Sequence, residues 1–132
     1  MIQAAGPALL AWWAFRLEKR NRRRSTLIAI VQEWSTYEMV AARDLVWRRT
    51  EKKVRWADIL ENPDDGHKAY RVVELLGRLA VMIEQGEING RDARTFLHLS
   101  MAGVPERIES VWGDNRDATF EAAIRLKRYI HW

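Results

Sequence analysis

Histidines and adjacent carboxylates are the residue types in this sequence that could hold a metal ion or transfer a proton. His67, His98 and His131 are far apart along the chain, and no HExxH or ExxH pair places two ligands on one helix face. Asp64 and Asp65 lie near His67, where two carboxylates and one imidazole would form only an open, weak cation site. We favour a solvated turn there and a partly buried structural role for His98. The sequence therefore predicts no metal and no cofactor.

Motifs for nucleophilic or phosphoryl chemistry are also missing. The sequence contains no GxSxG, GxGxxG or Walker pattern and no cysteine, which leaves no recognisable nucleophile, phosphate loop or thiolate site. Glu74 and Arg78 stand four residues apart on an expected helix, and we interpret them as a surface ion pair. Glu84, near the end of the same helix, is a candidate for a buried acid facing Arg94. We expect a protein that is not an enzyme.

Charge is concentrated in one short segment. Residues 16–24 contain six basic residues and one acid, a local charge of +5, which leaves a net charge of −1 for residues 25–132 out of the overall +4. Three interpretations compete: a solvated helix face, a patch beside a membrane, or an arm that binds nucleic acid. The basic residues are Arg16, Lys19, Arg20, Arg22, Arg23 and Arg24, and we refer to them as the basic cluster.

The residues before the basic cluster favour the membrane. Trp12, Trp13 and Phe15 stand in an apolar run with two leucines and are not interleaved with the arginines, as base-stacking residues would be. Fifteen helical residues span about 22 Å, less than the roughly 30 Å hydrocarbon core. Basic residues after an apolar run place that flank inside. The sequence thus predicts membrane lipid as a partner, at the inner membrane with the bulk of the domain cytoplasmic. A small helical nucleic-acid-binding protein is the alternative.

Apolar spacing along the rest of the chain predicts helices and no strand. We expect an all-α fold, a small helical bundle of four to six helices with an N-terminal apolar helix. The division is a segment 1–24 with the basic cluster and a helical bundle domain 25–132. A capping box at Ser35 to Glu38 starts one helix, Asn62 to Gly66 reads as a turn, and Gly86 ends a long helix. The expected core is Leu27, Val31, Trp34, Leu45, Val73, Leu76, Leu79, Ile83, Phe96, Leu97 and Ile124.

The chain contains seven tryptophans, which is many for 132 residues. Aromatic side chains are enriched at the centres of protein interfaces. We therefore expect Trp47, Trp56 and Trp112 to face a protein partner or a second copy of the chain. The predicted function is a membrane-anchored, non-enzymatic interaction module or an accessory subunit of a larger assembly.

From Arg22 to about Tyr129 the sequence resembles a bacterial family known as domain of unknown function 4760. The most specific shared piece is LAVMIEQGEI, a long helix followed by a cap glycine and an isoleucine. The resemblance implies a membrane-anchored helical bundle in the bacterial cytoplasm, and it carries over no catalytic residue. The matching stretches are RRRSTL (Arg22 to Leu27), QEW (Gln32 to Trp34), Glu38 to Arg43, VVELLGRLAVMIEQGEI (Val72 to Ile88) and FEAAIRLK (Phe120 to Lys127).

Overall fold

The computed structural model describes the backbone of residues 2–113 and 117–130, and within these ranges the side chains of all residues except 2–7, 97–100 and 130. In this part of the chain every regular element is a helix, which confirms the all-α prediction. The described residues form eight helices rather than four to six, and two of them, α3 and α8, are only six and four residues long. The helices are α1 (Ile2–Trp34), α2 (Tyr37–Glu51), α3 (Trp56–Glu61), α4 (Pro63–Glu84), α5 (Gly90–Ser100), α6 (Val104–Trp112), α7 (Ala118–Arg125) and α8 (Lys127–Ile130).

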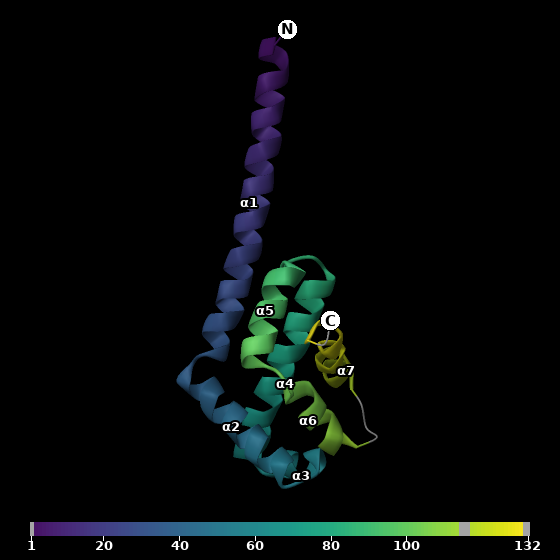
Figure 1. Cartoon of the computed structure of the whole chain (residues 1–132). Coiled ribbons are helices and arrows are strands. Elements are labelled where there is room, and N and C mark those ends of the chain that lie inside the picture. The colour runs from purple at the N-terminus through teal and green to yellow at the C-terminus, as the bar shows by residue number, and fades with distance from the viewer. Residues whose placement is uncertain (1, 114–116, 131–132) are drawn as a thin grey trace.

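Helix α1 joins the apolar run, the basic cluster and the first core-forming residues in one element of 33 residues. The predicted N-terminal apolar helix is therefore not a separate element. After Pro7 no proline or glycine interrupts this segment, so its backbone hydrogen bonding continues without a break. Figure 1 shows the N-terminal half of α1 projecting beyond the bundle, while its other end meets α2 and α4. The boundary at residue 24 lies inside this helix and stays a prediction.

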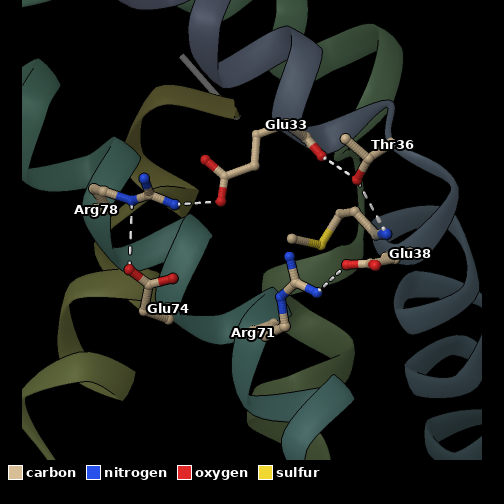
Figure 2. Close-up of polar contacts among 7 residues, drawn as sticks. Glu33, Thr36, Glu38, Arg71, Glu74 and Arg78 are labelled. Atoms are coloured by element: carbon tan, nitrogen blue, oxygen red, sulfur yellow. Dashed lines mark hydrogen bonds and ion pairs between the residues drawn. The ribbon is translucent and has the colours of Figure 1, made fainter.

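The C-terminal end of α1 is fixed to the bundle by burial and by one ion-pair network. Ile30 and Trp34 are 2% and 1% exposed. A guanidinium nitrogen of Arg78 on α4 donates to Glu33 at 2.7 Å, and its Nε lies 3.4 Å from Glu74 (Figure 2). The hydrogen bond to Glu33 raises the pKa of Arg78. The expected pair of Glu74 and Arg78 is thus present, and Glu33 extends it across two helices.

The start of α2 differs from the expected capping box by one residue. Thr36 is the N-cap, and its hydroxyl accepts a hydrogen bond from the backbone N–H of Met39 at 3.3 Å. Ser35 instead donates to a backbone carbonyl one turn back in α1. Glu38, the expected second member of the box, pairs with Arg71 of α4 at 2.9 Å (Figure 2). The helix begins directly after this cap, at Tyr37. Glu38 does not complete the capping box, because its carboxylate forms an ion pair with Arg71 of α4 instead.

The segment expected to be a turn is the beginning of α4, so that prediction was wrong. Asn62 is the N-cap, and its side-chain oxygen accepts hydrogen bonds from the backbone N–H groups of Asp64 and Asp65 at 3.1 and 3.2 Å. Proline occupies the first turn and two acids follow it, an order that suits a helix N-terminus. Gly66 is buried within the helix. Asparagine, proline and aspartate are common both in turns and at helix N-termini, and in this segment they begin a helix.

Helix α4 is the centre of the core, and α2, α3 and α7 pack against it. Gly77 allows α7 to approach α4 closely, because a Cβ at this position would lie 3.0 Å from the carbonyl oxygen of Thr119 in α7. Of the expected core, Trp34, Leu45, Val73, Leu76 and Leu79 are buried, whereas Leu27, Ile83, Phe96 and Ile124 are partly buried against the core. Val31 is half-buried, and the side chain of Leu97 lies outside the described residues.

Candidate functional site

The first part of α1 exposes apolar side chains on all sides of the helix. We call residues 8–15 the apolar tip. Trp12, Trp13 and Phe15 are 55%, 59% and 59% exposed, and Leu9 and Leu10 are exposed still further. Consecutive residues of a helix point about 100° apart, so these side chains surround the axis and do not form one stripe. A helix that is apolar all round needs an apolar environment on every side.

The basic cluster follows the apolar tip without interruption on the same helix. Glu18 is its single acid and lies 3.6 Å from Arg22, with both side chains about 70% exposed, so this pair adds little stability. The guanidinium of Arg16 lies 4.9 Å from the ring centre of Trp12, within the range of a cation–π contact. Along the axis of α1, the apolar residues therefore come first and the basic residues follow, with Arg16 at the boundary.

A cleft of about 620 Å³ lies between the basic cluster and the beginning of α5. We call it the basic groove. On the α5 side, the Asn89 side chain accepts a hydrogen bond from the backbone N–H of Arg91 at 2.9 Å and caps the helix. The N-terminal end of α5, which carries partial positive charge, thus faces the basic cluster. The groove is lined by Trp13, Arg16, Leu17, Lys19, Arg20, Arg23, Arg24, Asn89, Arg91 and Asp92.

Two features of the basic groove were not found from the sequence. Arg91 joins the basic cluster although almost seventy residues separate it from Arg23. Arg23 is half-buried and leans toward the loop before α5, where one of its nitrogens would lie 4.0 Å from a Cβ placed on Gly86. Sequence spacing within α1 contains no signal of either contact, because both depend on the angle between α1 and the bundle.

Two of the three tryptophans assigned to a partner interface are core residues, which corrects that expectation. Trp56 and Trp112 are 2% and 9% exposed. Their rings stack with centres 4.7 Å apart, and Trp112 also stacks on Phe120 at 4.0 Å. This aromatic stack fills the space between α3, α6 and α7. Of these three tryptophans only Trp47 is exposed, at 43%, and the guanidinium of Arg107 lies 3.6 Å from its ring centre.

The candidate acid, base and metal residues do not converge in the described part of the chain. No group of three His, Asp or Glu side chains there could hold a metal ion. Asp65 pairs with Arg49 at 3.0 Å, and His67 is exposed. Glu84 is not a buried acid, since it is about one-third exposed and lies 2.8 Å from Arg125. The His98 side chain and the whole of His131 lie outside the described residues.

Among the described residues, no helix is both long enough and apolar enough to cross a bilayer.

Comparison with known proteins found no matching family model, curated relative or solved structure. The resemblance to domain of unknown function 4760 therefore stays a prediction.

Proposed function

We propose that this protein is a membrane-anchored, non-enzymatic interaction module that inserts the apolar tip of α1 into the bilayer and rests its basic cluster on acidic headgroups. One observation carries the proposal: the apolar tip projects from the bundle with exposed aromatic side chains and is followed at once by the basic cluster. On a protein in water, this apolar surface would promote aggregation. Insertion removes it from water.

The distribution of apolar residues favours insertion by the end of α1. A helix that lies flat on a membrane needs one apolar face and one polar face, whereas the apolar tip is apolar around its whole circumference. Ile2 to Phe15 would extend about 21 Å, so the helix enters the hydrocarbon region of roughly 30 Å without crossing it. Trp12 and Trp13 then lie toward the interface, where indole rings are most favourable.

Two contributions hold the protein at the membrane, and the apolar one is the larger. Each large apolar side chain that leaves water contributes about 1.5–3 kcal/mol when it is fully buried. Each basic residue near acidic headgroups adds about 1 kcal/mol. Stable membrane attachment commonly combines an apolar and a basic signal. The bundle is then carried on the cytoplasmic side, with Trp47 available to a partner protein.

The test is sedimentation of the full chain with lipid vesicles, either neutral phosphatidylcholine or phosphatidylcholine with one-third phosphatidylglycerol. We expect binding to both, tighter to the acidic vesicles. Trp12→Ser with Trp13→Ser should weaken binding to both kinds of vesicle. Replacing Arg20, Arg23 and Arg24 by Gln should weaken only the preference for acidic lipid, by up to about 3 kcal/mol or roughly a hundredfold.

A matched control removes the same charge elsewhere. Lys52, Lys53 and Lys68 are exposed and lie on the bundle, so replacing all three by Gln should leave vesicle binding close to that of the unchanged chain. Recovery of the full chain in the supernatant without detergent, together with salt-sensitive binding to DNA or RNA, would reject the membrane proposal. That result would instead support the nucleic-acid alternative, in which the basic cluster contacts phosphates.

A further inference from the structure

A second cleft, of about 350 Å³, lies on the bundle between α2 and α6. This volume falls within the range of small-molecule sites, roughly 300–1,000 Å³. Its apolar walls include Val46 of α2, Val72 of α4 and Val104 of α6, and the ring of Trp47 borders it. The cleft shares no lining residue with the basic groove. It is an amphipathic cavity, because two arginines also line it.

The two arginines, Arg43 of α2 and Arg107 of α6, are each held against an indole ring. The guanidinium carbon of Arg43 lies 4.5 Å from the ring centre of Trp34, and that of Arg107 lies 3.6 Å from the ring centre of Trp47. Stacking restricts both long side chains before any ligand arrives, so binding would cost less conformational entropy. Two planar donor groups are therefore already placed at one cleft.

These two cations have no matching anion in the described structure. Among the ion pairs of the described residues, none includes Arg43 or Arg107. Asp44 also lines the cleft, but it pairs with Arg48 at 3.1 Å. The Nε of Arg43 is buried without a hydrogen-bond partner, and its partial burial lowers the pKa of Arg43. Two partly desolvated positive charges beside apolar walls favour an anion that also has an apolar part.

We propose that this cleft binds a small amphipathic carboxylate, with the carboxylate between Arg43 and Arg107 and the apolar group against Val46, Val72 and Val104. A planar carboxylate fits the paired donors of a guanidinium. The apolar walls disfavour a strongly hydrated phosphate, which would lose water without regaining equivalent hydrogen bonds. This cleft shares no residue with the basic groove, so ligand binding here can be tested separately from membrane attachment.

The experiment measures binding of 3-phenylpropionate to the full chain by titration calorimetry and by the indole N–H signals in an ¹H–¹⁵N spectrum. The neutral 3-phenylpropanamide is the matched probe, since it keeps the shape and loses the charge. We expect the acid to bind and to move the Trp47 signal, assigned with Trp47→Phe. The amide should bind at least about tenfold more weakly, because it lacks the charge-assisted hydrogen bonds.

Two arginine variants locate the site. Arg107→Gln should weaken binding of the acid at least about tenfold, whereas Arg128→Gln, which removes the same charge from an exposed residue of α8 outside the cleft, should change it by less than about twofold. Circular dichroism and thermal unfolding establish that both variants are folded, and Arg107→Lys provides a second variant that keeps the charge and should bind with intermediate strength. Equal binding of acid and amide, equal binding by both glutamine variants, or no binding of the acid overturns the proposal.

Discussion

Gly66 and Gly90 offer a pair of identical substitutions with opposite expected effects on stability. Both glycines lie in helices, α4 and α5, so Gly→Ala removes backbone freedom from the unfolded chain in each case and by itself stabilises by roughly 0.4–1 kcal/mol. The surroundings differ. A Cβ at Gly66 would lie 2.9 Å from the carbonyl oxygen and 3.1 Å from the Cα of Leu60, while a Cβ at Gly90 would meet nothing within 4 Å.

The magnitude at Gly66 follows from what would have to move. The atoms in the way belong to the backbone of α3, and this short helix buries Trp56 and Ile59 in the core. It cannot retreat without disturbing that packing. Overpacking of this kind costs about 1–3 kcal/mol, which exceeds the gain from the unfolded chain. Gly66→Ala should therefore lower the free energy of unfolding by about 1–2 kcal/mol, and Gly90→Ala should raise it by up to about 1 kcal/mol.

Urea unfolding, followed by tryptophan fluorescence and by far-ultraviolet circular dichroism, measures both changes. The denaturant dependence should be the same for the two variants, so that a shifted midpoint reports stability alone. A Gly66→Ala chain as stable as the original would show that α3 and α4 are not packed as closely as described. Destabilisation by Gly90→Ala would contradict the open space assigned to the start of α5.

Three further predictions concern the cap, the ion-pair network and the aromatic stack. Asn62→Ala should lower the unfolding free energy by about 1 kcal/mol because it removes the cap of α4; an unchanged urea midpoint would contradict this. In a double-mutant cycle, Glu33→Gln and Arg78→Met should show a coupling energy of up to about 1 kcal/mol that shrinks with salt, and coupling near zero would show that this pair does not hold α1 to α4. Phe120→Ala should cost about 3–5 kcal/mol, since Phe120 is fully buried against Trp112; a loss below that range by thermal unfolding would refute its place in the core.

Local sequence features determined most of the helices and several of their ends. Hydrophobic spacing predicts α2 and α4. Gly86, with φ of +74°, lies in the turn that terminates α4, as its position indicated. Asn89 caps α5 and proline opens α6. These signals work because capping, left-handed backbone and helical periodicity depend on residues only a few positions apart. The same local logic identified the exposed apolar run and the basic cluster.

Tertiary contacts decided what the residue types could not. Seven tryptophans are visible in the sequence, yet the stack of Trp56, Trp112 and Phe120 depends on how α3, α6 and α7 meet. The exposure of Trp47 depends in the same way on how α2 meets α6. The same indole pattern is compatible with an interface or a core, because burial is decided by partners distant in sequence. Likewise, Glu38 forms an ion pair with Arg71 on α4 and does not complete the local capping box. Helical periodicity cannot predict this tertiary contact.

The two clefts show the same division between sequence and structure. The positive charge of residues 16–24 is a property of the sequence, and it needed no fold to be noticed. The addition of Arg91 to the basic groove, and the meeting of Arg43 with Arg107 beside Trp47, required α5 and α6 to be placed against α1 and α2. Charge and hydrophobicity are additive along a chain, whereas a binding site depends on distances between segments, and only the packing of the helices sets those distances.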